Sequence, residues 1–307
     1  MKSVIQSILA IIILSACSAG LSLKNSSSLV QVNAPAGNFL GEGEENFYVF
    51  KGIPYAQPPV GDLRWKAPKN LSAKDEVIDA TKFKSECIQP GTEGLIPNRN
   101  VSVGSEDCLY LNIYIPKNQT DLDKNQFPVM FWIHGGSNIW GSGDFYDFSK
   151  LATTQQVIVV TINYRLGLFG WFSSEHLRNT ATGLDKSSNF GQLDLIKGLE
   201  WVQENISAFG GDKDNITIFG ESAGGHNVLT LLASPLSEGL FHKAISQSGY
   251  VSSYTQKFAE EESELSSKKI FAEETKFLVS DAEVADYLRS LSSEEVYQKY
   301  VAKAEEH

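Results

Sequence analysis

The sequence has little positive charge and few histidines and cysteines. It carries 26 lysine and arginine residues against 37 acidic ones, and its net charge at pH 7 is −11. A chain this acidic has no surplus of cations to release counterions from nucleic acid or to hold an anionic membrane surface. Its five histidines are scattered without the spacing of metal ligands, and no nucleotide-binding glycine fingerprint is present. We therefore expect no nucleic acid, no metal and no cofactor, but a small, neutral partner.

The chain begins with a short apolar run over residues 8–14, which leads into Leu14-Ser15-Ala16-Cys17. This run is too short to span a bilayer and is typical of an export signal. The four residues resemble the bacterial lipobox, in which the signal is cut before a cysteine that becomes lipidated. We expect a signal peptide over 1–16, a lipid at Cys17 as the membrane attachment of an envelope lipoprotein, and a polar tether over 17–27. The alternative is an ordinary signal cut later, which discards Cys17 and yields a secreted protein.

Cysteine is scarce, with three in the whole chain. Without Cys17, the even pair Cys87 and Cys108 remains, and in an exported protein such a pair favours a disulfide. Closing that loop would contribute about 3 kcal/mol in the chain-entropy model. The alternative is two free, buried thiols.

Apolar patterning indicates strands that alternate with helices. Residues 127–134 and 157–164 are almost continuously apolar, as expected for strands buried on both faces of a mainly parallel sheet. Residues 189–209 have the spacing of an amphipathic helix. A short strand over 216–219 is then followed by a second helix that carries Val228, Leu229, Leu231 and Leu232. This order predicts an α/β fold.

The two ends of the folded region have weaker patterns. Residues 28–52 are short and strand-like, with turns between them. The acidic run Glu260-Glu261-Glu262 and the tail to Glu305-Glu306 are predicted to be solvated helix faces. Ala285, Leu288 and Leu291 share one helical face, so we assign this end to the folded body.

The strongest chemical signal is Gly220-Glu221-Ser222-Ala223-Gly224, between the short strand and the second helix. A serine on so tight a turn holds its hydroxyl out above the sheet, and the flanking glycines allow the turn without a clash. The Ala223 N–H lies at a helix N-terminus, where developing negative charge is favoured. The pattern predicts that Ser222 is a nucleophile.

A second signal is His134-Gly135-Gly136-Ser137, directly after a buried strand. A glycine loop at this point supplies further N–H groups to the oxyanion hole of an α/β-hydrolase. His134 precedes the serine, whereas in this fold the histidine of the triad follows it. We therefore expect His134 to brace the loop instead of acting as the base.

These motifs lie in register with others that resemble the type B carboxylesterase family, which includes cholinesterases and bacterial carboxylesterases. The further matching stretches are residues 50–56, 58–61, 105–112, 163–165, 189–194, 209–212 and 244–249. The resemblance runs from about Ser28 to the end of the chain. It implies an α/β-hydrolase domain over residues 28–307, with a central, mostly parallel sheet flanked by helices.

The resemblance assigns roles to individual residues. It makes Ser222 the nucleophile that is acylated by a small-molecule ester, and it makes the N–H groups of Gly136, Ser137 and Ala223 the oxyanion hole. It pairs Cys87 with Cys108 as the family's first disulfide. Two positions depart from the family pattern. Ser137 replaces a glycine or alanine and adds a hydroxyl that narrows the acyl pocket, and His226 replaces a small or nonpolar residue. Glu221 matches an acidic residue that is buried near the site in relatives.

The acid and the histidine of the triad are expected outside this chain, because family members are much longer and carry both later in sequence. His226, His242 and His307 are the alternatives as base, although His226 would project from the side of its helix. Asp281, Glu283 and Asp286 are interpreted as a helix surface.

Without a base the serine hydroxyl is a poor nucleophile, so we expect weak or no esterase activity from this chain alone. A truncated record or split gene would explain that. The alternatives are a binding or adhesion module that keeps the fold, and a decaying gene. The retained Ser222 and glycine loop favour the enzyme.

Overall fold

The structure is a computed structural model that describes residues 28–72, 74–93, 96–117 and 126–306. The predicted signal peptide, the tether with Cys17, and His307 lie outside these residues. Within the described part of the chain, no helix combines the length and apolar character needed to cross a membrane.

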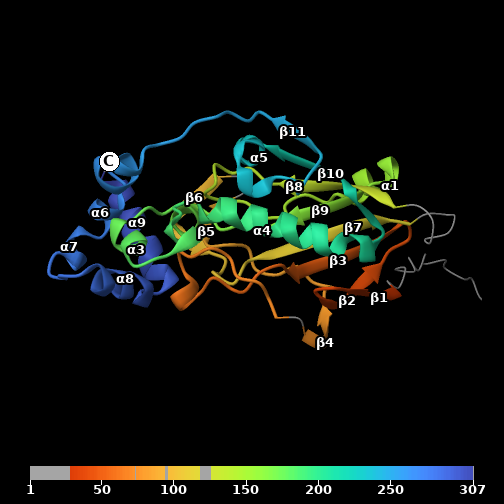
Figure 1. The fold of residues 1–307 in the computed structure, drawn as a ribbon, viewed down its shortest axis with the longest axis horizontal. Coiled ribbons are helices and arrows are strands. Elements are labelled where there is room, and N and C mark those ends of the chain that lie inside the picture. Colours follow the sequence, from red (N-terminus) through yellow and green to blue (C-terminus); the bar gives the residue numbers. More distant parts are fainter. Residues whose placement is uncertain (1–27, 73, 94–95, 118–125, 307) are drawn as a thin grey trace, which may run out of the picture.

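A mixed nine-stranded sheet forms the centre of the described residues (Figure 1). Its strand order is β1-β2-β3-β7-β9-β8-β10-β11, and β4 pairs with β2. The strands are β1 Ser28–Ala34, β2 Gly37–Gly43, β3 Phe47–Pro54, β4 Lys74–Asp79, β7 Tyr110–Pro116, β8 Phe127–Ile133, β9 Ile158–Ile162, β10 Gly211–Glu221 and β11 Lys243–Gln247. A separate hairpin consists of β5 Gln89–Glu93 and β6 Ile96–Val103.

Strand direction divides the sheet into two halves. From β1 to β7, and on to β9, neighbouring strands are antiparallel. From β9 through β8 and β10 to β11 they are parallel. The parallel half is the part that the apolar runs of the sequence predicted, and the strand-like N-terminal segment forms the antiparallel half.

Helices cover the sheet and gather at one of its ends. They are α1 Ser149–Gln155, α2 Gly167–Gly170, α3 Glu175–Asn179, α4 Phe190–Asn205, α5 Ala223–Ala233, α6 Ser267–Ile270, α7 Ala272–Thr275, α8 Asp281–Ser290 and α9 Ser293–Glu305. In Figure 1, α3 and α6 to α9 form a cluster at one end, far from β4. The segment after β11 runs from the sheet edge across to this cluster. Two short turns matter below: a 3₁₀ turn, Ile206–Phe209, and a π turn, Phe258–Glu262.

Two apolar cores lie on opposite faces of the sheet, as the alternation of side chains along a strand requires. In β8, Phe131 and Ile133 belong to the larger core with α4 and α5. Trp132, between them, belongs to a smaller core that includes Ala152 of α1 and Phe219 of β10. The predicted helix over 189–209 is α4 with the turn that follows it, and most of its side chains are buried.

The register of the parallel strands sets where their loops emerge. Ile133 at the end of β8 pairs with Gly220 of β10, and Gly220 pairs in turn with Ser246 of β11. The carboxyl ends of these strands therefore lie side by side. Just beyond these pairings, the loop after β8 and the turn after β10 leave the sheet at the same edge.

The acidic run differs from its prediction. Glu261 and Glu262 are at the surface, but Glu260 is buried in the π turn with Arg178 and Ser173 as partners. The Ser173 hydroxyl donates to the Glu260 carboxylate over 2.7 Å. Although burial opposes ionisation, the hydrogen bonds from Arg178 and Ser173 hold the pKa of Glu260 below its usual value. The prediction of a fully solvated acidic face was wrong because α3 supplies a cation.

Candidate active site

The strand-to-helix turn at residues 220–224, called the elbow below, has strained geometry. Ser222 connects β10 to α5 with φ 56° and ψ −120°, a conformation that non-glycine residues rarely adopt. Its N–H donates to the Gln247 carbonyl over 2.8 Å, and its own carbonyl accepts from His226 N over 2.9 Å. These two bonds tie the serine to β11 on one side and to the first turn of α5 on the other. The predicted strand, turn and helix are confirmed.

The elbow needs glycine on both sides of the serine because backbone approaches too closely for a side chain. A Cβ at Gly224 would lie 2.0 Å from the Ile133 carbonyl oxygen. One at Gly220 would lie 2.6 Å from the Gly224 carbonyl carbon. The start of α5 therefore packs directly on the end of β8. This contact fixes the height of Ser222 relative to the loop that follows β8.

Residues 134–138, called the glycine loop below, lie against the elbow. A Cβ built on Gly135 would be 3.3 Å from Ser222 Cβ and 2.8 Å from the Glu221 carbonyl oxygen. The next three residues have positive φ angles, 87° for Gly136, 57° for Ser137 and 58° for Asn138. At Gly136 a side chain would meet the Trp140 carbonyl oxygen at 1.9 Å. The structure thus brings together the two motifs that the sequence placed at distant positions.

His134 is buried beneath the glycine loop. Its Nδ1 lies 2.9 Å from the Gly135 carbonyl oxygen, and its ring stacks on Tyr164 with centroids 4.4 Å apart. Since a carbonyl accepts, Nδ1 carries the proton. Burial lowers the pKa of His134 to about 4, so the ring is neutral at pH 7. Nε2 has no hydrogen-bond partner among the described residues. These contacts fit the bracing role predicted for this residue.

The other described histidines are engaged away from Ser222. His226 Nδ1 contacts the Tyr250 carbonyl, His242 Nδ1 accepts from Ile216 N over 3.1 Å, and His176 pairs with Asp281 at 2.6 Å. His307 lies outside the described residues. Within the described ranges, no side chain hydrogen-bonds the Ser222 hydroxyl.

Glu221 differs from the expectation drawn from relatives. Its side chain is exposed, not buried. One carboxylate oxygen, Oε2, would lie 3.2 Å from a Cβ at Gly135, so the side chain extends toward the glycine loop. It is exposed because the neighbouring strand β11 is itself exposed along most of its length.

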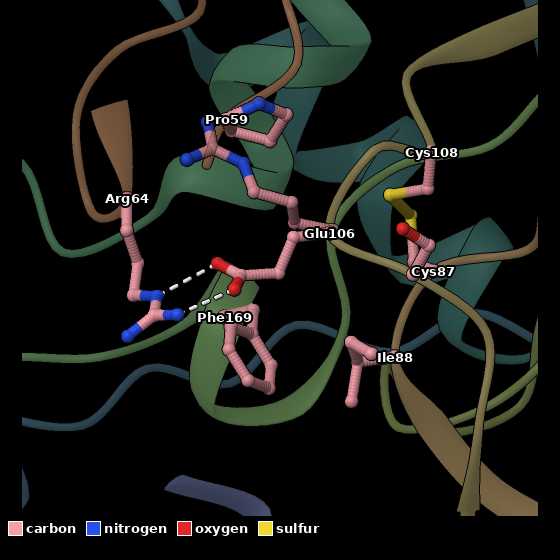
Figure 2. A pocket seen from close by; sticks show the side chains of 9 residues that line it. Pro59, Arg64, Cys87, Ile88, Glu106, Cys108 and Phe169 are labelled. Atoms are coloured by element: carbon pink, nitrogen blue, oxygen red, sulfur yellow. Dashed lines mark hydrogen bonds and ion pairs between the residues drawn. A yellow bond between two sulfur atoms is a disulfide. The ribbon is translucent and has the colours of Figure 1, made fainter. Parts of the chain in front are cut away.

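The predicted disulfide between Cys87 and Cys108 is present, with an S–S distance of 2.03 Å. Figure 2 shows a small pocket beside it, in which Arg64 faces Glu106. Arg64 Nε and Nη2 donate to the two carboxylate oxygens over 2.7 and 2.5 Å, and Nη1 donates to the Leu291 carbonyl over 2.6 Å. The charges in this pocket are thus already satisfied. Neither the elbow nor the glycine loop lines it, and we do not place the substrate there.

Comparisons with known proteins agree with this geometry. The model of the carboxylesterase family matches residues 28–307. The chain belongs to the carboxylesterase family.

Two relatives show how far the likeness extends. The para-nitrobenzyl esterase of Bacillus subtilis (strain 168) is 47% identical over 220 residues, which are 71% of this chain and 43% of the relative. Carboxylesterase 1E of Rattus norvegicus is 44% identical over 239 residues, 73% of this chain and 41% of the relative. The chain thus spans less than half the length of these relatives.

Solved esterase structures confirm the α/β-hydrolase fold. A thermophilic para-nitrobenzyl esterase superposes with a TM-score of 0.76 at 37% identity, covering 90% of this chain and 55% of that one. A carboxylesterase of Geobacillus stearothermophilus gives a TM-score of 0.74 at 39% identity, covering 89% of this chain and 53% of that one.

Two polar residues of this carboxylesterase site were missed from the sequence. Asn138 ends the glycine loop, and Asn227 lies five residues after Ser222 on α5. The side chain of Asn227 is buried, although its neighbours Val228 and Leu231 are apolar core residues. An asparagine within an otherwise apolar helical face is the signal that could have found it, because a buried amide needs a partner.

Among the described residues, no three His, Cys, Asp or Glu side chains gather in a way that could hold a metal ion.

Proposed function

We propose that this chain carries the nucleophile half of a serine carboxylesterase, with Ser222 as the residue that is acylated. The observation that carries the proposal is the close packing of the glycine loop on the elbow: a Cβ built on Gly135 would lie 3.3 Å from Ser222 Cβ, and the next three residues have positive φ angles. The backbone N–H groups of Gly136, Ser137 and Ala223 are the donors we assign to the oxyanion hole.

The reaction follows from these roles. The Ser222 oxygen attacks the ester carbonyl carbon and loses its proton to a base. The carbonyl oxygen becomes an oxyanion held by the three N–H donors, and collapse expels the alcohol, which takes up a proton. Water then hydrolyses the acyl-enzyme through the same kind of intermediate. No cofactor is needed for any of these steps.

We further propose that residues 28–306 are by themselves weakly active or inactive. The side chains of the described histidines contact other groups. The catalytic base and its acid are therefore proposed to lie outside residues 28–306. A positioned general base typically contributes about 10²–10⁴-fold to the rate. Without that base, the rate enhancement comes only from the oxyanion hole and from substrate binding.

An apolar hollow lies beside the glycine loop and suits the uncharged part of an ester. Ile139, the residue after Asn138, lines it with Leu166 and Phe169 and with Tyr297 and Tyr300 of α9. The strained backbone of Ser222 also favours an enzyme over a binding module. Such backbone is unfavourable and persists only where the surroundings hold it, and a binding module has no need of it.

Labelling of Ser222 with a fluorophosphonate tests the proposal. We expect slow labelling that Ser222→Ala abolishes, at a rate at least about 100-fold below that of the Bacillus subtilis relative. Labelling that survives Ser222→Ala would refute the nucleophile. A rate equal to that of the relative would instead refute the proposed lack of a base.

We also propose that the chain is exported and lipidated at Cys17, on the strength of the sequence pattern over 8–17. Expressed in a bacterium, the protein should then enter the detergent phase on Triton X-114 partition, and Cys17→Ala should move it to the aqueous phase. Recovery of wild type from the culture medium would favour the alternative of a secreted protein.

A further inference from the structure

A pair of asparagine amides connects the glycine loop to the helix that carries the elbow. Asn227 of α5 donates from Nδ2 to Oδ1 of Asn138 over 2.9 Å. Asn227 is 1% exposed and Asn138 is half-buried, so the bond is partly buried. The two residues are 89 positions apart in sequence. Each lies close to a proposed oxyanion donor, since Asn138 follows Ser137 and Asn227 lies one turn beyond Ala223.

Tyr164 and Gly167 extend this pair into a network around both ends of the loop. The Tyr164 hydroxyl donates to the His134 carbonyl over 2.7 Å and lies 3.4 Å from Asn138 Oδ1. Burial raises the pKa of Tyr164, and a hydrogen bond from Asn227 opposes that rise. Gly167 N donates to the Asn138 carbonyl over 2.7 Å.

The loop needs such external contacts because its own backbone is unfavourable. Ser137 and Asn138 both have left-handed φ angles without being glycine. Residues in such conformations persist where the surroundings over-determine them. Inside the loop, His134 Nδ1 donates to the Gly135 carbonyl, and at its far side Ile139 N and Trp140 N donate to the Gly136 carbonyl. The amide of Asn227 supplies the link to the helix that the loop itself lacks.

We propose that Asn227 is a positioning residue that, through Asn138, holds the N–H groups of the glycine loop in register with the N–H of Ala223. The inference rests on the proposed function, because it assumes that these N–H groups receive an oxyanion. The N–H groups of an oxyanion hole must all point at the same substrate oxygen. A misplacement of about 1 Å can lower the rate about 100-fold. A hydrogen bond between the two donor-bearing segments keeps them together without touching the substrate.

The test uses Asn227→Leu, which keeps the volume close and removes the donor. Hydrogen–deuterium exchange is followed in peptides that cover residues 134–141, together with fluorophosphonate labelling of Ser222. We expect exchange at Ile139 and Trp140 to rise at least tenfold relative to β8, and labelling to slow at least tenfold. Asn138→Leu should reproduce both effects from the half-buried end of the bond. The double variant should slow labelling no further than the single ones.

Asn205→Leu is the matched control. Asn205 is also a helical asparagine with 1% exposure, and it donates to Trp201 O and accepts from Ala36 N, away from the site. Its loss should lower stability without a selective rise of exchange in the loop. An equal rise in the control would show that the loop reports only global stability, and would overturn the proposal.

The remaining outcomes separate the two proposals. If wild type is labelled and Asn227→Leu changes neither exchange nor labelling, the positioning role is wrong and the proposed nucleophile stands. If exchange rises while labelling is unchanged, the link is structural and the positioning role is again wrong. If wild type is not labelled at Ser222, the proposed function fails, and loop exchange alone decides whether Asn227 orders the loop. Should Asn227→Leu not fold, Asn138→Leu gives the same readouts.

Discussion

Two strands of the same parallel half, β9 and β11, have opposite surroundings. Every residue of β9 is buried, whereas β11 is exposed along its length apart from half-buried Ala244. Ile162 of β9 has no exposed surface, but Ile245 of β11 is 45% exposed. The elbow lies between these extremes, on β10, with buried β8 on one side and exposed β11 on the other. We infer that the side of the site formed by the glycine loop is firmly held and the side formed by β11 can yield.

The largest effect should follow from adding a methyl group at Gly224, where it would meet the backbone of buried β8. Gly224→Ala places Cβ 2.0 Å from the Ile133 carbonyl oxygen, and neither strand nor helix can move away. We expect a loss of about 4 kcal/mol or more in the free energy of unfolding, measured by urea denaturation.

Gly225→Ala is the matched comparison on the exposed side. Its Cβ would lie 2.6 Å from the Gln247 carbonyl oxygen of β11. We expect a loss at least 2 kcal/mol smaller than at Gly224, roughly within the usual range for overpacking. Equal losses at both positions would contradict the idea that β11 yields.

A second test makes the same substitution in both strands. Ile162→Ala should cost about 3 kcal/mol, because it removes buried methyl groups and leaves a cavity. Ile245→Ala should cost less than about 1 kcal/mol, because half of that side chain is already in water. Urea denaturation of the two variants measures the difference, and a cost at Ile245 as large as that at Ile162 would show that β11 is covered in solution.

A further test concerns pH and the buried end of β8. His134 has a pKa of about 4 in the folded protein and 6.5 as its ordinary value, so the unfolded chain binds the proton more tightly. Stability is therefore highest above pH 6.5 and falls as the pH drops from 6.5 toward 4. We expect this group to contribute a loss of about 2 kcal/mol between pH 7 and pH 5.

His134→Asn isolates that contribution, because it removes the titrating ring and leaves the carboxylates. The variant should lose less stability than wild type between pH 7 and pH 5 in paired denaturation curves. If the free energy of unfolding changed equally with pH in wild type and variant, protonation of the His134 ring would not destabilise the folded protein, and the prediction would be wrong.

The sequence predicted the parts of the site that depend on local backbone. Glycines around Ser222 and after His134 specify turns, and apolar runs specify the strands before them, so the elbow, the glycine loop and their fold class were all predictable. The disulfide was predictable from the two cysteines that remain once Cys17 is set aside and from the family resemblance.

What the sequence did not predict depends on partners that are distant along the chain. Glu260 was assigned to a solvated face together with its acidic neighbours, but Arg178 reaches it from α3, 82 positions earlier in the chain. The bond between Asn138 and Asn227 has the same character, since the two residues are 89 positions apart and no local pattern pairs them. The exposure of Glu221 follows from the strand beside it, whose surroundings no local pattern records.

The pairing of Ile133 with Gly220 also limits where residues can be inserted into this sequence. One residue inserted into β8 would shift its register against β10 by about 3.3 Å and turn its side chains to the opposite cores. The glycine loop would then leave the sheet one step away from Ser222. Insertions near this site are therefore expected to be tolerated in exposed residues past the loop, such as 144–147, but not in the strands that set its position.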